Sequence, residues 1–127
     1  MSGKLTSTTY PFLPVSIHVR VHKGKSVDLD THALIDTGFS GDIVVPTTNE
    51  LKHSTPDAYA TWTMADGSEV LAPIFLGTIR FPELDRDVAE MVGVTVTILG
   101  DQALIGQSVL RHFTLTLDHG KQAILEP

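Results

Sequence analysis

The chain has 127 residues, a net charge of -6 and no cysteine. This length suffices for one hydrophobic core, and the lack of cysteine excludes disulfides, thiolate metal sites and thiol nucleophiles. The N-terminus lacks the apolar segment of a secretory signal, no window approaches the roughly 18 apolar residues of a membrane span, and no basic run is present. We therefore expect a cytoplasmic protein without nucleic-acid or membrane partners, with a polar leader over residues 1–11 and one domain over residues 12–127.

Short apolar or alternating stretches separated by turn residues predict a chain built mostly of β-strands, as in a small barrel or sandwich. Residues 15–22 alternate apolar and polar side chains without a fault, as a half-buried strand requires. Helix is expected only as one turn near residues 48–52 and as a short amphipathic helix over residues 107–113. The expected strands are, in order, residues 15–22, 26–35, 43–45, the two arms of 61–72, 74–81, 88–99, 103–106, 115–117 and 123–125.

Two of these stretches carry more detailed predictions. Asp66 and Gly67 lie between the two strand-like arms of residues 61–72, and an Asp-Gly pair in this context favours a projecting hairpin. The strand over residues 88–99 is expected to place four alternate residues on one face, namely Val92, Val94, Val96 and Ile98.

Residues 33–41 read Ala-Leu-Ile-Asp-Thr-Gly-Phe-Ser-Gly, so a carboxylate ends an apolar strand and begins a tight loop. Burial disfavours an ionised Asp and raises its pKa, so this position holds either an acid satisfied by its own turn or a catalytic one. An Asp-Thr-Gly triplet alone is a weak signal, because Asp and Gly both favour turns. The apolar strands on both sides of Asp36 favour the catalytic interpretation.

The Asp-Thr-Gly loop, the Asp-Gly hairpin and a late Leu-Ile-Gly at residues 104–106 that precedes a helix occur in the order typical of one family. From about residue 12 to 124 the chain resembles the retropepsin-like aspartic proteases. The resemblance implies an all-β fold, a small closed barrel with one short C-terminal helix, in which the late strand lies against the acidic loop. Viral members usually carry Arg-Asn after the late glycine; this chain has Gln107 and Ser108, so the viral dimer network is not assumed.

The chemistry of this family requires two carboxylates that share one proton, because like charges so close cannot both ionise readily. The sequence has no second Asp-Thr-Gly or Asp-Ser-Gly, so the second carboxylate is expected from another copy of the chain, in a homodimer with the site on its two-fold axis. The resemblance then implies an endopeptidase in which Asp36 is the general acid and base, Thr37 braces the paired loops and Gly38 allows close approach of the backbone. It implies a peptide or protein substrate and neither a metal nor a cofactor, and the leader is either flexible or at the dimer interface.

The resemblance also implies a set of substrate contacts. Phe39 stands where viral members usually have a small residue, so it is expected to narrow the adjoining substrate pocket. The hairpin resembles the flap that covers the bound peptide. The other expected substrate-binding residues are at its tip: Met64, Ala65, Asp66 and Gly67. Trp62 is interpreted as core packing.

Other interpretations remain open at this point. His18, His22 and His32 are compatible with a surface zinc site, although solvated strand histidines are the commoner explanation. The chain is alternatively a catalytically silent member of the family that binds peptide or mediates dimerisation. A third possibility is an unrelated β-barrel binding module whose Asp-Thr-Gly is accidental.

Overall fold

The computed structural model describes residues 3–21, 24–85 and 90–127. Within these ranges the chain is mostly β-strand, with two helices of four residues each, α1 (Asn49–Lys52) and α3 (Gln107–Leu110). Neither is long or apolar enough to cross a membrane. The strands are β1 (Leu5–Ser7), β2 (Phe12–Arg20), β3 (Ser26–Ile35), β4 (Ile43–Val45), β5 (Ala58–Thr63), β6 (Glu69–Arg80), β7 (Met91–Ile98), β8 (Leu104–Ile105), β9 (Thr114–Asp118) and β10 (Gln122–Glu126).

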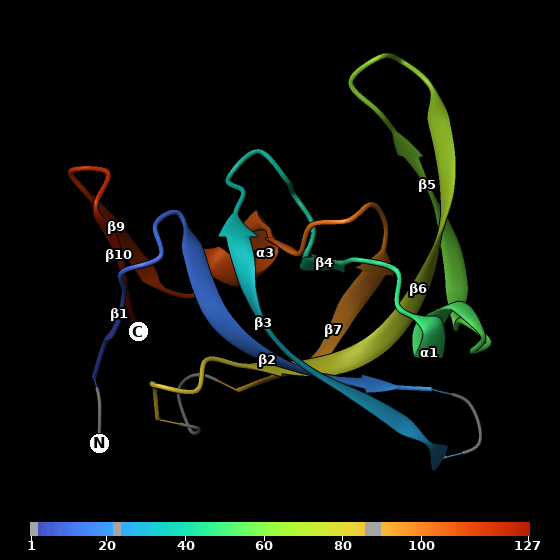
Figure 1. The fold of residues 1–127 in the computed structure, drawn as a ribbon, viewed down its shortest axis with the longest axis horizontal. Coiled ribbons are helices and arrows are strands. Elements are labelled where there is room, and N and C mark those ends of the chain that lie inside the picture. The colour runs from blue at the N-terminus through green and yellow to red at the C-terminus, as the bar shows by residue number, and fades with distance from the viewer. Residues whose placement is uncertain (1–2, 22–23, 86–89) are drawn as a thin grey trace.

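Six of the described strands close into a ring in the order β2-β3-β8-β4-β7-β6, with β6 pairing back onto β2. β5 pairs with β6 alone, so the β5–β6 hairpin projects beyond the ring (Figure 1). The strict alternation expected from residue 15 is confirmed in β2, where Val15, Ile17 and Val19 are almost completely buried in the core. The predicted all-β fold with a small closed barrel is therefore confirmed. The largest fully buried side chains are Phe75, Phe81, Leu5, Leu13, Ile17, Ile43, Ile79, Ile105 and Leu125.

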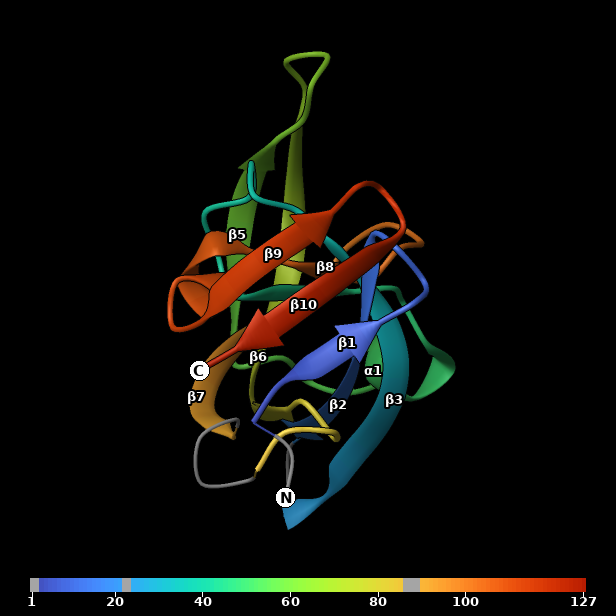
Figure 2. The ribbon, with the colours of Figure 1, turned by 90° about the vertical axis from the view of Figure 1, so that its left-hand side faces the viewer.

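A second, three-stranded sheet has the order β1-β10-β9 and covers one side of the ring (Figure 2). Its β1 comes from the segment expected to be a polar leader, where Leu5 pairs with Leu125 and has no exposed surface. A three-residue strand is too short to show a period in the sequence, so this strand was not predicted. Because Leu5 is buried, residues 5–7 belong to the fold, while their place at a dimer interface stays a prediction.

The strand predicted over residues 88–99 is β7, of which the described part begins at Met91. Val94 is buried with 4% of its surface exposed, whereas Val92 is 75% exposed, so the prediction that both lie on one face is wrong. Gly77 pairs with Val94 and Thr78 with Val92, which leaves Gly93 as an extra residue at a positive φ of 70°. This β-bulge shifts the alternation by one residue and turns Val92 outward.

The order of the strands determines where the loop that contains Asp36 lies. β8 lies between β3 and β4, parallel to the first and antiparallel to the second. The connection from β3 to β4, residues 36–42, must therefore pass the end of β8, where the chain enters α3 (Figure 1). The helix predicted over residues 107–113 is present but is confined to Gln107–Leu110. The late strand thus lies beside the Asp36 loop, as predicted.

Candidate active site

Asp36 directly follows β3, and its surroundings fix both its backbone and its carboxylate. Its N–H donates to the carbonyl of Ile105 on β8 at 3.0 Å, and its carbonyl accepts from the N–H of Phe39 at 3.2 Å. The Oδ1 atom accepts the N–H of Gly38 at 3.1 Å. The side chain is only partly buried. The loop therefore holds the Asp36 carboxylate in one orientation at the surface. The carboxylate is still able to accept hydrogen bonds from a ligand or from a second carboxyl group.

Thr37 and Gly38 complete the predicted triplet and are both exposed. A Cβ atom at Gly38 would lie 3.4 Å from Asp36 Oδ1, so a side chain there would cover part of the carboxylate. The glycine keeps this side of the acid open. Thr37 is held through its backbone, because its carbonyl accepts a hydrogen bond from Nε2 of Gln107 at 2.9 Å.

Gln107 and Ser108 of α3 hold the Asp36 loop by hydrogen bonds, a role that was not predicted from the sequence. Besides the contact of Gln107 with Thr37, the hydroxyl of Ser108 donates to the carbonyl of Ser40 at 2.8 Å. The backbone N–H of Gln107 also donates to the carbonyl of Phe39 at 2.8 Å. Both residues are at positions where the chain departs from the viral pattern. Within a single chain they hold the Asp36 loop onto the helix.

Phe39 fills the space under the loop, with 9% of its surface exposed. A Cβ atom at Gly41 would lie 2.5 Å from Phe39 Cζ, and one at Gly106 would lie 2.5 Å from Phe39 Cδ2. Real side chains do not approach so closely, so both glycines are required by the position of this ring. The glycine of the late Leu-Ile-Gly thus allows the strand and the loop to meet.

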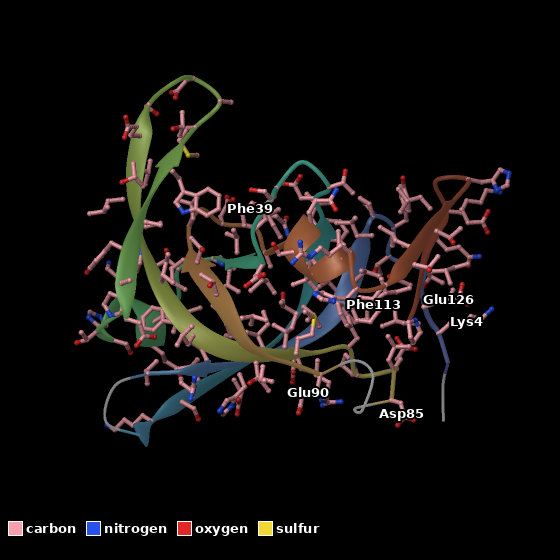
Figure 3. The ribbon with its side chains drawn as sticks, turned by 180° about the vertical axis from the view of Figure 1, so that it is seen from behind. Lys4, Phe39, Asp85, Glu90, Phe113 and Glu126 are labelled. Carbon is pink, nitrogen blue, oxygen red and sulfur yellow. The ribbon has the colours of Figure 1, made fainter. Side chains whose placement is uncertain are left out.

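Trp62 was expected to pack in the core, but it is only partly buried and joins the hairpin to the Asp36 loop. Its ring and that of Phe39 have centroids 5.0 Å apart and planes tilted by 44°, a favourable aromatic geometry. Figure 3 shows Phe39 on the side of the molecule between the β5–β6 hairpin and α3. The contact holds the end of β5, two residues before the exposed tip, next to the Asp36 loop. An isolated Trp gives no sequence signal for such a partner.

The hairpin tip contains the four remaining predicted substrate-binding residues, Met64, Ala65, Asp66 and Gly67, all of them exposed. The N–H of Gly67 donates to the carbonyl of Met64 at 2.9 Å, and Gly67 has a φ of +87°, as in a turn that ends in a glycine bulge. The hydroxyl and N–H of Ser68 both donate to Asp66 Oδ1, at 2.6 and 2.9 Å, and these bonds lower the pKa of Asp66. The predicted hairpin is confirmed. No hydrogen bond links its tip to Asp36 within the described ranges.

The histidines do not assemble a metal site in the part of the chain that is described, where no three potential ligands cluster. His18 instead contacts Asp28 across the β2–β3 ladder at 2.6 Å. His32 pairs with Pro14, four positions further along that ladder and so about 13 Å away. His22 lies outside the described residues.

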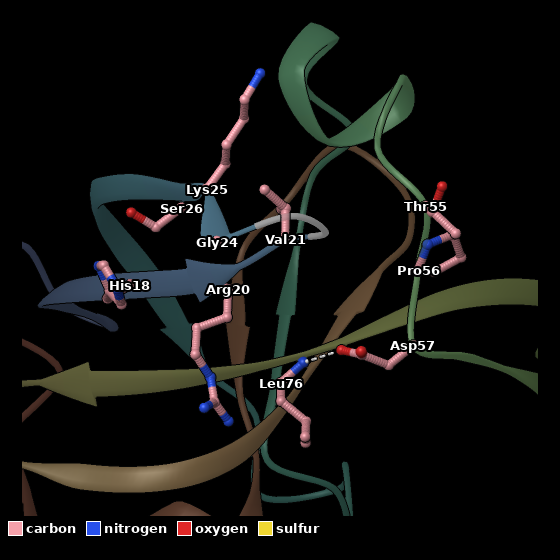
Figure 4. A pocket seen from close by; sticks show the side chains of 10 residues that line it. All are labelled: His18, Arg20, Val21, Gly24, Lys25, Ser26, Thr55, Pro56, Asp57 and Leu76. Carbon is pink, nitrogen blue, oxygen red and sulfur yellow. Dashed lines mark hydrogen bonds between the residues drawn. The ribbon is translucent and has the colours of Figure 1, made fainter.

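A cavity of about 600 Å³ does not contain Asp36. It lies where β2 ends and β3 begins. There Arg20 and Lys25 point in opposite directions, and the Asp57 carboxylate accepts the N–H of Leu76 at 3.0 Å (Figure 4). Because its charged groups diverge, this cavity does not form a second candidate for the active site.

The closed ring, the loop that passes the end of β8 and the projecting hairpin together define a retropepsin-like fold. The crystal structure of a retropepsin-like aspartic protease from Rickettsia conorii matches it with a TM-score of 0.56 and 20% sequence identity, over 98% of this chain and 96% of that one. At this identity the match establishes the fold. No protein-family model and no curated protein sequence matches the chain. The barrel therefore has the retropepsin-like topology, and the role of its Asp-Thr-Gly stays a prediction.

Proposed function

We propose that the protein is an aspartic endopeptidase that is active as a homodimer, with one Asp36 from each subunit. The observation that carries this proposal is the placement of Asp36. In a retropepsin-like fold, its carboxylate is held by the N–H of Gly38 and its backbone by Ile105, at the surface of a loop fastened from below. One chain supplies one such carboxylate, and the exposed position of the loop leaves room for its symmetry mate.

In the proposed reaction, two Asp36 carboxyl groups share one proton. The ionised group takes a proton from a water molecule, whose oxygen attacks the carbonyl carbon of the peptide, while the protonated group gives its proton to the carbonyl oxygen. The C–N bond of the tetrahedral intermediate then breaks as the carboxyl group that took the water proton gives it to the nitrogen. The other carboxylate takes back a hydroxyl proton of the intermediate, which restores the shared proton. Placing two like charges side by side separates their apparent pKa values, so that one acid and one base coexist at the same pH.

The other predicted residues have supporting roles in this proposal. Thr37 is exposed beside the acid, where it is able to contact the partner's loop, and Gly38 leaves the carboxylate accessible. The hairpin tip from Met64 to Gly67 covers the bound peptide and offers it backbone N–H groups. Phe39 lies at the base of this cover and bounds the substrate cleft.

The test is a subunit-mixing experiment with the Asp36→Asn variant. If each site needs two Asp36 side chains, and subunits exchange freely, activity on a peptide library falls as the square of the wild-type fraction, to about a quarter in an equal mixture. A site built from one chain would lose only about half. The Asp85→Asn variant, which changes a carboxylate of the β6–β7 connection, is the matched control and leaves activity unchanged.

A catalytically silent, peptide-binding member of this fold is the alternative. It predicts that wild-type protein dimerises in sedimentation experiments and yet cleaves no member of the library between pH 4 and 7. Cleavage that is lost in the Asp36→Asn variant, and that is inhibited by a statine-type mimic of the tetrahedral intermediate, excludes this alternative.

A further inference from the structure

A cavity of about 280 Å³ lies between the Asp36 loop, the β5–β6 hairpin and β7. Phe39 and Asp42 of the loop form one part of its wall, Trp62 of β5 another, and Thr95 and Thr97 of β7 a third. The volume suits one amino-acid side chain. Because Phe39 also contacts Trp62, the cavity adjoins the segment that presents the carboxylate.

Trp62 contributes a hydrogen-bond donor that has no acceptor. Its indole Nε1 is shielded from water and is the one buried side-chain nitrogen or oxygen without a hydrogen bond among the described residues. Leaving such a donor unpaired costs about 1–3 kcal/mol, so buried polar groups without partners are rare in native proteins. Because this donor is shielded from the cavity as well as from water, a ligand acceptor reaches it only when the indole moves.

Asp42 contributes an acceptor to the same cavity. Its Oδ2 atom accepts the N–H of Thr95 at 2.8 Å, which fixes the side chain across to β7. In the described part of the chain, no hydrogen bond to Oδ1 is present. The carboxylate is partly buried and therefore retains a strong acceptor that faces a site of limited size.

The hydroxyl residues Thr95, Thr97 and Ser108 also line the cavity, but a hydroxyl both donates and accepts and so does not discriminate. The donor of Trp62 and the anionic acceptor of Asp42 do select among side chains. An aliphatic side chain would leave the Trp62 N–H unpaired, and a carboxylate would be repelled by Asp42. A lysine would satisfy Asp42 but place a second donor against the indole. A primary amide satisfies both, because its oxygen accepts and its nitrogen donates.

We propose that this cavity is a specificity pocket for a glutamine or asparagine side chain, whose carbonyl oxygen accepts from Trp62 and whose NH₂ group donates to Asp42. Calling the ligand part of a peptide substrate rests on the proposed function. Entry of the amide requires a small movement of the indole. That movement displaces the indole from its contact with the Phe39 ring.

Trp62 is also the only tryptophan in the chain, so the protein gives a single indole N–H signal in a ¹⁵N NMR spectrum. The experiment titrates ¹⁵N-labelled Asp36→Asn protein, which binds without cleaving, with N-acetyl-glutamine methylamide and N-acetyl-asparagine methylamide. The N-acetyl derivatives of leucine, glutamate and lysine methylamide are the comparison. We expect the amide probes to move the indole N–H signal downfield, and to bind at least about fivefold more tightly than the leucine probe.

Two variants test the two contacts. Asp42→Asn retains an acceptor for Thr95 but presents an NH₂ group to the ligand, so it should bind the glutamine probe at least about fivefold more weakly. Trp62→Phe keeps an aromatic contact with Phe39 and removes the donor, so it should bind the amide probes no more tightly than the leucine probe. Because this variant has no indole, its binding is measured from the backbone N–H signal of Gly41. Unchanged backbone spectra elsewhere show that each variant is folded.

The outcomes separate this inference from the proposed function. The amide pocket is overturned if the leucine probe binds as tightly as the amide probes or more tightly. It is also overturned if the indole signal stays in place, as expected when the N–H points at the Phe39 ring. Both results hold even if the wild type cleaves peptides. A wild type that cleaves no peptide overturns the proposed function, while a shifted indole signal still establishes the pocket. In an active enzyme, cleavage sites should be enriched in glutamine or asparagine at one fixed position, and Asp42→Asn should remove that enrichment.

Discussion

Replacement of Gly106 by alanine tests how the Asp36 loop is supported. The added Cβ would lie 2.5 Å from Phe39 Cδ2 and 2.8 Å from the Phe39 carbonyl oxygen, and it would also meet the carbonyl oxygen of Gly41. Gly106 has a φ of -100°, which alanine adopts without strain, so the cost comes from overpacking alone.

The clash has no cheap relief, because two of the three atoms belong to the backbone. The Phe39 carbonyl accepts from Gln107 at 2.8 Å and the Gly41 carbonyl from Ser108 at 3.2 Å, so moving either atom weakens a hydrogen bond to α3. Overpacking of this kind costs about 1–3 kcal/mol. For a domain of this size, that loss lowers Tm by roughly 4–15 °C. Because Ile105 holds Asp36, the displacement should also lower kcat/KM.

Thermal unfolding by circular dichroism, at one fixed protein concentration, measures the effect. Gly3→Ala is the matched control, because a Cβ at Gly3 has nothing within 4 Å and should leave Tm unchanged. Adding Phe39→Leu to Gly106→Ala removes the ring contact but not the backbone ones, so it should restore only part of the loss in Tm. A Gly106→Ala protein within about 0.5 kcal/mol of wild type would refute this account of the loop.

Three further results are expected. Gln107→Ala removes one hydrogen bond to the loop, so it should cost about 1 kcal/mol in urea unfolding and lower kcat; an unchanged kcat would show that this bond does not position the acid. Ser68→Ala should raise the pKa of Asp66 toward its ordinary value in an NMR titration, and an unmoved pKa would contradict the assigned cause. Because the pKa of Asp66 is lowered in the folded hairpin, its stabilising effect is present above the unfolded pKa and is lost as the pH falls through the folded one. Val94→Thr should destabilise the protein by about 1–3 kcal/mol and Val92→Thr by less than about 0.5, whereas equal losses would contradict the bulge.

Much of the fold could be predicted because strand period, turn residues and the Asp-Gly pair are local signals. The apolar alternation from residue 15 gives β2, Asp66 and Gly67 give the hairpin, and Pro46 ends β4. The loop around Asp36 and the late strand beside it were recognised from their order along the chain. Each of these features is encoded by neighbours in sequence.

The features that were missed depend on contacts between distant segments. The bulge at Gly93 arises from pairing with β6, so a simple alternation cannot reveal it. β1 exists because β10 supplies its partner, and closure of the ring needs β2 to meet β6. The contact of Phe39 with Trp62 likewise links residues that no local pattern relates.

The candidate site follows the same division. Asp36, Thr37 and Gly38 form a contiguous motif and were identified directly. Gln107 lies 70 positions after Thr37 and supports this motif, but the sequence identified it only as a departure from the viral pattern. The structure shows what this residue does, because its side chain donates a hydrogen bond to the Thr37 carbonyl of the same subunit.

The central claim is that the acid works only as one of a pair, so the most direct measurement is the separation of symmetry-related Asp36 carboxyl oxygens in a crystal structure of the protein. We predict a pair at hydrogen-bond distance, about 2.5–3.0 Å, on a two-fold axis between the loops. Asp36 side chains that face solvent, with no second carboxyl group within reach in any dimer found in solution, would contradict the account.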